Sequence, residues 1–510
     1  MQNDTLKKIR EKIVIVPKMR VKEIADISEC NAMTYKQFAR HAYTKYGTAE
    51  KVLLSDSALG LLVEKACKKI AQRDGIVGKK LIKDVGISID EITVWGDSIL
   101  EEGVGLEAPA QEVIANVLMA IDDNYVCTWH CIDWLKENVA TVEAYFEISW
   151  LGWLKAPRAV KKLGVKYKSK KVDINGERKQ EKLIFSNGSE ELKGILDWIE
   201  VRGKQGLSSK VFMPGLKKRV GEIEAEMHAR LFFGNVCSGK GVERLPIKFG
   251  VSRNIQASVS GWLVVAFIDA FKDGASDKDW ERILCCRVLG GADKKIKHRR
   301  NVAEKIKRNE SKVVLASLVK HLANAEGDLY LVDLLSRLET LREEKYTSKE
   351  FGIWLNSFLG CFFNKNANVS LVEASALESI RMAVKSLYEL APVTSAHTGR
   401  YWLDLYVREL NSLVLKEGNK NNVACFFDAD DCFVEPGDDT WCAGLDLNMW
   451  GGEWKKPALI DEMVLAEWGH PCVQEKKWKE DRVKWLETVV DTSFCGVISC
   501  ARKYENSLAV

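Results

Sequence analysis

GDLYLVDLLSRLETL, residues 327–341, has the spacing of an amphipathic helix. Asp328 follows a glycine and can accept hydrogen bonds from the unpaired amides of a first helical turn. Apolar residues then recur at intervals of three and four, which places them on one helical face. These residues are Leu331, Leu334, Leu335, Leu338 and Leu341. The stretch therefore predicts a capped helix with one buried side.

Helical spacing of apolar residues extends over most of the chain. Only nine prolines occur in 510 residues, and proline is the residue that helix interiors tolerate least, because it removes a backbone donor and clashes with the preceding turn. We therefore expect a mainly α protein. The other segments with this spacing are 106–147, 215–233, 278–290, 315–326, 349–363, 370–390 and 474–490.

The composition bounds the class of protein. A chain of 510 residues with 46% hydrophobic residues can bury a large core, and its length suits two or three domains or one bilobed unit. No apolar run reaches the roughly 18 residues that a membrane-spanning helix needs, so we expect neither a membrane span nor secretion. Fourteen cysteines without a signal peptide indicate reduced thiols in the cytosol or nucleus.

The clearest strand lies near the start, in KIVIVPKMR, residues 12–20. Its four central residues are all β-forming, and the proline that follows ends the strand. A lone strand needs the edge of a partner for its backbone donors and acceptors. We expect an oligomerisation arm that pairs with another protomer in an assembly and is loose or folded back in a monomer. The arm residues are Ile13, Val14, Ile15, Val16 and Pro17.

Asn175-Gly176 marks a second exception to helix. This pair suits the two positive-φ positions of a type I′ turn, and apolar residues alternate with charged ones on either side. The segment 165–185 therefore predicts a projecting two-stranded β-hairpin. The hairpin would be basic, since residues 155–182 hold eleven Lys+Arg against three Asp+Glu.

Charge divides the chain more sharply than the total of +4 suggests. Residues 426–510 carry 9 Lys+Arg against 17 Asp+Glu, a net of −8, which leaves +12 for residues 1–425. Such a split is typical of a body that binds a polyanion and a tail that docks elsewhere, with ordinary charge scatter as the alternative. Six tryptophans after residue 440 indicate either a docking module or the core of a small C-terminal subdomain.

Two basic clusters are denser than a structural helix requires: KAPRAVKKLGVKYKSKK (155–171) and DKKIKHRRNVAEKIKR (293–308). Spaced lysines and arginines can follow the phosphates of a nucleic acid without reading its sequence. Trp150, Trp153 and Tyr167 lie near enough in the sequence to stack bases, although such a tryptophan pair also suits a core. For each cluster the alternative is a solvated face or a localisation signal. The candidate RNA contacts are Lys155, Arg158, Lys161, Lys162, Lys166, Lys168, Lys294, Lys295, Lys297, Arg299, Arg300, Lys305 and Arg308.

An acidic string, CFFDADDCFVEPGDD (425–439), carries the enzymatic alternative. A hydrophobic strand that ends in Asp428-Ala-Asp430 is similar to the opening motif of haloacid-dehalogenase-type phosphatases, in which the first carboxylate attacks phosphorus beside Mg²⁺. That fold continues with strands, whereas the residues after 439 have mostly helical spacing. We therefore expect an acidic loop, no catalytic residue and no cofactor. VCTWHC (126–131) and the later cysteines and histidines lack the paired C-x-x-C spacing of a zinc site, so no metal ligand is predicted.

The first strand belongs to a longer segment, TLKKIREKIVIVPKM (5–19), that resembles the N-terminal arm of rhabdovirus nucleoproteins, especially the vesiculovirus type. VGISIDEITVWGDSI (85–99) is similar to the G-I-x-I segment and the Gly-Asp-x-Ile turn of that family. LAPVTSAHTGRYWLDLYVREL (390–410) is similar to its serine-rich loop and the helix after it. Ser395-Ala396-His397-Thr398 departs from the S-P-Y-S of that loop, which puts any role copied onto these four residues in doubt.

WLKENVATVEAY (134–145) and SLVKHLANAE (317–326) instead resemble segments of nairovirus nucleoproteins, so the resemblance points to the wider group of nucleoproteins of negative-strand RNA viruses. It implies two helical lobes with single-stranded genomic RNA in a basic cleft between them, protomers joined by exchanged arms, and no catalysis. It adds Arg400 to the RNA contacts and a viral polymerase or its cofactor to the partners. The protein would then lie in the virion ribonucleoprotein and in the host cytoplasm or nucleus.

These observations predict a mainly α, bilobed, nucleoprotein-like fold for a chain that polymerises along single-stranded RNA. The alternatives are a Mg²⁺-dependent phosphohydrolase centred on Asp428 and Asp430, and a helical scaffold protein without enzymatic activity. The expected parts are an N-terminal arm (1–30), an N-terminal lobe with the basic hairpin (31–290), a C-terminal lobe (291–425) and an acidic, tryptophan-rich C-terminal segment (426–510).

Overall fold

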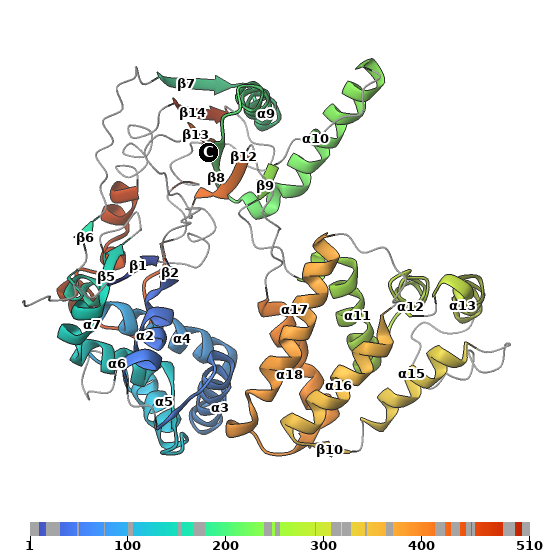
Figure 1. Cartoon of the computed structure of the whole chain (residues 1–510), viewed down its shortest axis with the longest axis horizontal. Helices are drawn as coiled ribbons and strands as arrows, with labels where there is room; N and C mark the ends of the chain where they lie inside the picture. Colours follow the sequence, from blue (N-terminus) through green and yellow to red (C-terminus); the bar gives the residue numbers. More distant parts are fainter. Residues whose placement is uncertain are drawn as a thin grey trace, which may run out of the picture. The chain divides into compact units, whose positions relative to one another are not determined.

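The chain forms two compact units in a computed structural model (Figure 1). Unit 1 comprises residues 1–53, 63–251 and 419–510, and unit 2 comprises residues 54–62 and 252–418. Most described residues lie in helices, so the prediction of a mainly α chain is confirmed. Within the described ranges no helix is long and apolar enough to cross a membrane. The structure describes residues 10–16, 31–47, 50–75, 77–99, 106–150, 156–164, 166–167, 179–238, 247–249, 255–290, 292–307, 318, 328–341, 344–363, 371–413, 424–429, 439–444, 450, 454–482 and 495–501.

Unit 1 contains a four-stranded parallel sheet in the order β2-β1-β5-β6. The ring of Phe38 packs edge-on against Phe146 at 5.3 Å between ring centroids, which fixes the first helix on this sheet. The strands are β1 (Glu11–Val16), β2 (Asn31–Thr34), β5 (Phe146–Trp150) and β6 (Lys166–Tyr167). The helices that follow or flank them are α2 (Tyr35–Tyr46), α3 (Asp56–Asp74), α4 (Gly78–Trp95), α5 (Ala108–Met119), α6 (Thr128–Glu137), α7 (Val139–Tyr145) and α8 (Arg158–Lys162).

Strand β1 lies inside this sheet. Ile13 to Val16 are 0 to 3% exposed, and β1 pairs with β2 along one edge and with β5 along the other. This pairing within one chain is the folded-back arrangement expected of a monomer, and exchange of Ile13–Val16 between protomers stays a prediction; Pro17 lies outside the described residues. A continuous apolar run is the signature of a parallel strand covered on both faces. The sequence pattern identified the strand but not its partners.

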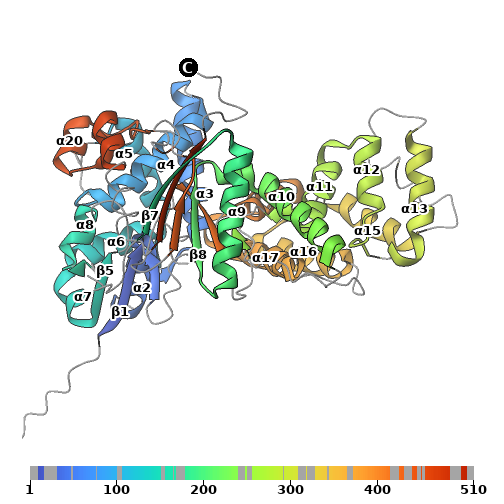
Figure 2. The ribbon, with the colours of Figure 1, turned by 90° about the horizontal axis from the view of Figure 1, so that it is seen from above.

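A six-stranded parallel sheet forms the second layer of unit 1, in the order β7-β14-β13-β8-β12-β9. Helices α9 and α10 pack on it, and their apolar residues share one core with Val211, Phe426 and Trp441 of the strands (Figure 2). The strands are β7 (Lys179–Phe185), β8 (Ser209–Met213), β9 (Ile247–Phe249), β12 (Ala424–Asp428), β13 (Asp439–Cys442) and β14 (Cys495–Ala501). The helices are α9 (Gly188–Lys204), α10 (Leu216–Ser238) and the short α20 (Glu462–Glu467).

The acidic C-terminal segment is therefore not a part of its own. Strands β12, β13 and β14 alternate in space with strands from residues 179–249. Trp441 is 2% exposed, its ring lies 5.4 Å from that of Trp198 in α9, and its indole Nε1 donates to the Ser499 hydroxyl at 2.7 Å. A change in charge composition along the sequence indicates a change in surface charge. It does not indicate a domain boundary, because parallel strand pairing joins segments that are distant in sequence. The units also divide at 251/252, whereas the sequence predicted a boundary at 290/291.

The predicted basic hairpin is wrong for the strands that the structure describes. Tyr167 in β6 pairs with Trp150, whereas Lys179–Phe185 pairs in parallel with Cys495–Ala501, so the two strands belong to different sheets. The Asn175-Gly176 turn lies outside the described residues. A turn signal depends only on local residues, whereas Leu183 and Phe185 are half-buried against the core of the six-stranded sheet.

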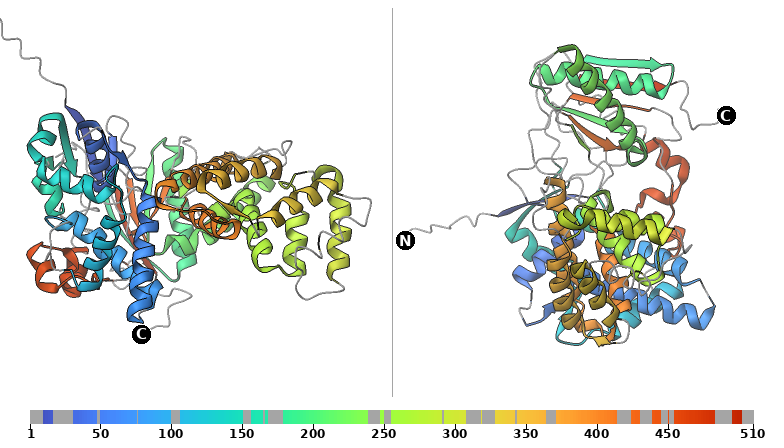
Figure 3. Two further views of the ribbon diagram at one scale, coloured as in Figure 1. Left: turned by 90° about the horizontal axis from the view of Figure 1, so that it is seen from below. Right: turned by 90° about the vertical axis from the view of Figure 1, so that its right-hand side faces the viewer.

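Unit 2 is built of packed helices with one short two-stranded ribbon. Helices α16, α17 and α18 pack on one another and on α11, and α12 packs beside α13 (Figures 1 and 3). The helices are α11 (Val259–Asp273), α12 (Asp277–Leu284), α13 (Ala292–Lys307), α15 (Leu329–Thr340), α16 (Ser348–Phe362), α17 (Leu371–Tyr388) and α18 (Gly399–Ser412), and the ribbon pairs β10 (Lys345–Tyr346) with β11 (His397–Thr398).

Helix α15 confirms the prediction made for residues 327–341. The Asp328 side chain accepts a hydrogen bond from the Leu331 amide at 3.2 Å, as an N-cap should. The five predicted leucines are each 0 or 1% exposed. Both features depend on residues within one helix, which is why the sequence alone could specify them.

Candidate nucleic-acid interface

Helix α13 carries the second basic cluster and stands at one end of unit 2, beside α12 (Figures 2 and 3). Val302 and Ala303, each 2% exposed, form part of its buried side. Opposite them the helix presents charged residues to solvent: Lys297, Arg300 and Glu304 are exposed. Lys295 lies on the same side as Val302 and is half-buried. The periodicity of the helix thus separates the cluster into an anchoring side and a solvent side.

Arg299 belongs to the anchoring side, so its prediction as a phosphate contact is wrong. Its guanidinium is 0% exposed, donates from Nε to Asp328 Oδ2 at 2.6 Å and from Nη2 to the Gly290 carbonyl at 2.7 Å. The same Asp328 carboxylate caps α15. Arg299 therefore ties α13 to the start of α15, and no phosphate can reach it without dismantling that contact. Sequence density could not reveal this, because the partner lies 29 residues away.

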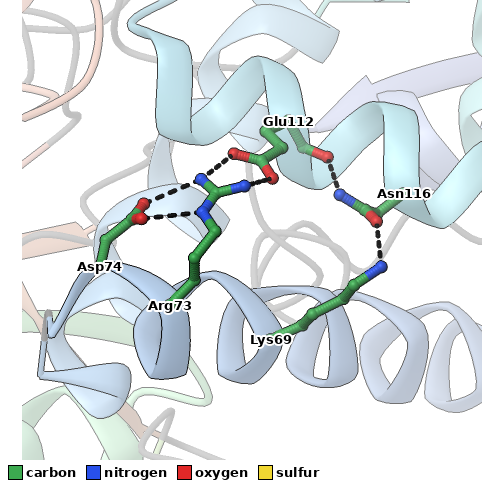
Figure 4. A network of polar contacts seen from close by, with 5 residues as sticks. All are labelled: Lys69, Arg73, Asp74, Glu112 and Asn116. Carbon is green, nitrogen blue, oxygen red and sulfur yellow. Dashed lines mark hydrogen bonds and ion pairs between the residues drawn. The ribbon is translucent and has the colours of Figure 1, made fainter.

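The solvent side of α13 carries two exposed cations, Lys297 and Arg300. Among the described residues, none forms an ion pair with either of them. Arg73 on α3 shows the contrasting case: it is also exposed, but its guanidinium is held by the carboxylates of Asp74 and Glu112 (Figure 4). A cation without a carboxylate partner keeps its full attraction for a phosphate.

Three further candidates of this cluster cannot be placed by side chain. Lys294 and Lys305 lie within α13, but their side chains fall outside the described part of the structure. Arg308 follows the last described residue of the helix. All three remain predictions.

The first basic cluster is represented by α8. Lys161 is exposed, whereas Arg158 and Lys162 both contact Asp97: Lys162 Nζ lies 2.5 Å from Oδ1, and Arg158 Nη2 lies 3.5 Å from Oδ2. The hydrogen bond from Lys162, helped by the charges of Arg158 and Lys136, holds the pKa of the Asp97 carboxyl below its usual range. Lys155 and Lys168 lie outside the described residues, and only the backbone of Lys166 in β6 is described.

The aromatic residues proposed to stack bases do not form a described platform. Trp150 is 7% exposed within β5, so its ring belongs to the core. Trp153 and the side chain of Tyr167 lie outside the described residues.

Arg400 sits in an acidic setting on α18. Its Nη2 lies 3.3 Å from Asp273 Oδ1, and Asp269 and Asp404 flank Lys272 on the same two helices. The three aspartates and two cations leave a net negative charge near Arg400. This net negative charge disfavours a phosphate near Arg400. Arg400 was predicted as an RNA contact because of the resemblance, and not because of the local charge.

A half-buried lysine whose charge acts on Asp97 gave no signal in the sequence. Lys136 on α6 donates from Nζ to the Gly96 carbonyl at 3.0 Å, and burial lowers the pKa of its amine to about 8. Asp133, one turn earlier, is buried and accepts from the Ile99 amide at 3.1 Å, and burial raises the pKa of its carboxyl. A single lysine on a helix of mixed composition does not reveal such burial.

Lys136 makes a pH-dependent contribution to stability. Its amine pKa is lower in the folded chain than in the unfolded chain, so above pH 8 the unfolded chain binds more protons and folding becomes more favourable as pH rises. We expect the free energy of unfolding of the unsubstituted protein to increase by about 1–2 kcal/mol between pH 8 and 10 relative to Lys136→Met. Chemical denaturation of both proteins across this range measures the difference; parallel profiles would show that Lys136 titrates normally.

Asp428 lies at the carboxyl end of β12, an interior strand of the parallel sheet, and its Oδ2 accepts from the Leu216 amide at the start of α10 at 3.1 Å. Asp430 lies outside the described residues. We expected mostly helical residues after this motif, but two strands, β13 and β14, follow it and join the same sheet. The edge formed by the carboxyl ends of parallel strands is where ligands of open α/β sheets bind.

Metal ligands do not converge in the described part of the chain: no group of three or more histidine, cysteine or acidic side chains could hold an ion there. Cys127 Sγ lies 3.2 Å from His130 Nδ1, but burial raises the pKa of the thiol to about 11, so it remains protonated. The cysteine side chains that the structure describes are all free thiols. Comparison with protein-family models and with curated proteins finds no match to this chain.

Proposed function

We propose that this protein binds single-stranded RNA through its phosphates, as a nucleoprotein of a negative-strand RNA virus would. The observation that carries the proposal is the solvent side of α13, where Lys297 and Arg300 meet no described carboxylate while the buried Arg299 anchors the helix. The net charge of +12 over residues 1–425 supports the same polyanion. Such binding is sequence-independent, because phosphate contacts carry no base information.

Assembly along the RNA belongs to the proposal. In the single chain β1 is enclosed by β2 and β5, so exchange of this strand between protomers would require it to leave its own sheet. Neighbouring protomers and a polymerase or its cofactor remain proposed partners on the strength of the resemblance described for residues 5–19, 85–99 and 390–410.

Reversing two charges on α13 tests the proposal. Lys297→Glu/Arg300→Glu should weaken binding of a generic single-stranded RNA oligonucleotide at least about tenfold and should flatten the dependence of log affinity on log salt by roughly 1.4, about 0.7 for each phosphate no longer neutralised. Fluorescence anisotropy at several salt concentrations measures both quantities.

A matched control separates a local contact from a change in net charge. Arg381 and Lys385 are exposed on α17 of the same unit, so Arg381→Glu/Lys385→Glu introduces the same charge change elsewhere. This control should retain most of the affinity and the original salt slope. Equal losses of RNA affinity in the two variants would show that net charge, and not the position on α13, causes the effect. No loss in either variant would show that α13 does not contact the RNA.

A phosphohydrolase remains the second candidate, because the position of Asp428 at the carboxyl edge of a parallel sheet favours it. Asp428→Asn keeps an oxygen that can accept from the Leu216 amide, and so preserves the contact with α10. With Mg²⁺ and a generic phosphate ester, a phosphohydrolase predicts hydrolysis by the unsubstituted protein and none by the variant. Absence of hydrolysis by the unsubstituted protein excludes this candidate.

A further inference from the structure

Asp97 binds the basic side chains of α8 in the way that a phosphate would. It follows α4 and places one carboxylate oxygen 2.5 Å from Lys162 Nζ and the other 3.5 Å from Arg158 Nη2. Lys136 lies close enough for its charge to act on the same carboxylate. Carboxylates and phosphates are bound by the same lysine and arginine groups.

The charge around Asp97 is not balanced by that one carboxylate. Arg158, Lys162 and Lys136 surround it, and exposed Lys161 is their neighbour on α8. Asp133, whose charge also acts on Lys136, is buried and bound to the Ile99 amide. Among the described residues, the charges that shift the pKa of the Asp97 carboxyl are all positive, so cations outnumber the single exposed carboxylate at this contact.

The contact is accessible and can exchange. The side chains of Asp97, Arg158 and Lys162 are 46%, 38% and 51% exposed. Exposed ion pairs of this kind are weak, since solvent screens them and holding long side chains costs entropy. A phosphodiester, carried to the surface by a strand already bound elsewhere, can compete with a single carboxylate.

We infer that α8 forms a second RNA contact surface that Asp97 restrains, so that Arg158 and Lys162 exchange the Asp97 carboxylate for an RNA phosphate when the strand binds. The inference rests on the proposed RNA binding. Asp97 then competes with an RNA phosphate for Arg158 and Lys162. The affinity for RNA depends on how easily the contacts of Asp97 with these two side chains break.

Neutralising the competitor gives the first test. Asp97→Asn removes the charge with little change in shape, and should strengthen binding of the oligonucleotide about two- to fivefold, the range expected on removal of one competing exposed ion pair. The salt dependence should steepen, by about 0.7 for each additional phosphate that the protein neutralises. Asp197→Asn is the matched control, because Asp197 is also an exposed aspartate of unit 1 that pairs with an arginine, Arg230, at 2.6 Å.

The source of the tighter binding is tested by removing the cations. Arg158→Ala/Lys162→Ala should abolish the increase in affinity in the Asp97→Asn background and should cost less affinity when Asp97 is present. Titration with inorganic phosphate in the same assay distinguishes a strand-borne phosphate from a free one. A free-phosphate site would be filled, and the increase lost, at millimolar phosphate under constant ionic strength, whereas a site for RNA would keep the increase.

The unsubstituted protein provides an independent readout. Acylation of lysines followed by mass spectrometry should show that the oligonucleotide protects Lys162 along with Lys297, and leaves exposed Lys349 reactive. If Lys297 is protected while Lys162 is not, and Asp97→Asn binds no better than Asp197→Asn, the restrained surface is refuted and RNA binding by α13 stands. If the unsubstituted protein binds no RNA at all, the proposed function itself fails.

Discussion

Asp328→Asn is expected to lower the free energy of unfolding of unit 2 by about 3–5 kcal/mol, the cost of leaving one partner of a buried ion pair uncompensated. The Arg299 guanidinium is 0% exposed and faces Asp328 Oδ2 at 2.6 Å. Asparagine caps helices about as well as aspartate, so the contact with the Leu331 amide survives and the effect isolates the lost charge. Hydrogen exchange of peptides from α13 and α15 measures the change in unit 2 separately from unit 1.

The double variant Arg299→Met/Asp328→Asn is the control for this prediction. Removing both charges leaves no buried ion, and replacement of a buried pair by uncharged residues of similar volume is often neutral. We expect the double variant to recover most of the stability lost by Asp328→Asn. A double variant as unstable as the single one would show that packing, and not charge pairing, decides the result.

The second large effect concerns strand β1. Ile15→Ala should lower the free energy of unfolding of unit 1 by about 2–5 kcal/mol, because the side chain is 0% exposed and its truncation leaves a cavity. Lys12→Ala on the same strand changes an exposed side chain and should have little effect. Equilibrium denaturation with hydrogen exchange of peptides from β1 and β5 measures both variants.

Deletion of residues 1–20 tests the same strand more severely. It would leave the facing edges of β2 and β5 without a partner, so the four-stranded sheet should not form. An exchangeable arm predicts the opposite, a folded protein that only assembles poorly. If the truncated chain and Ile15→Ala both remain as stable as the intact protein, β1 is dispensable and the interior-strand assignment is wrong.

Local features of the fold were predictable, and the two best examples are α15 and β1. The Asp328 cap and the leucine face depend on neighbours within fifteen residues, and the run Ile13–Val16 has no other plausible conformation than a strand. What failed in each case was the partner: neither Arg299 for Asp328 nor β2 and β5 for β1 is encoded in the local pattern. The same continuous apolar run suits both a strand that is buried on both faces and a strand that forms an isolated arm.

The sequence predicted the region of the candidate nucleic-acid interface better than its individual residues. A dense basic cluster identified α13, but only the helix geometry separated Lys297 and Arg300 from the buried Arg299. The two carboxylates that reshape the interface, Asp328 and Asp97, come from other segments of the chain. Long-range pairing of this kind explains why counting basic residues overestimates the number of phosphate contacts.

The parallel six-stranded sheet was the largest feature missed. Its strands are short and come from residues 179–249 and 424–501, and none carries the alternation of a half-exposed strand over a long run. The tryptophans of the acidic segment were expected to mark either a docking module or a separate subdomain, and Trp441 instead packs on α9 in a core shared with residues 192–249.

A salt titration of RNA binding by the unsubstituted protein tests the proposed function most directly. With Lys297 and Arg300 each neutralising a phosphate, the logarithm of the affinity for a generic single-stranded oligonucleotide should fall linearly with the logarithm of the salt concentration, with a slope of about −1.4 or steeper. Two oligonucleotides of different sequence should give the same line. No binding at low salt, or binding whose strength does not change with salt, would contradict the proposal.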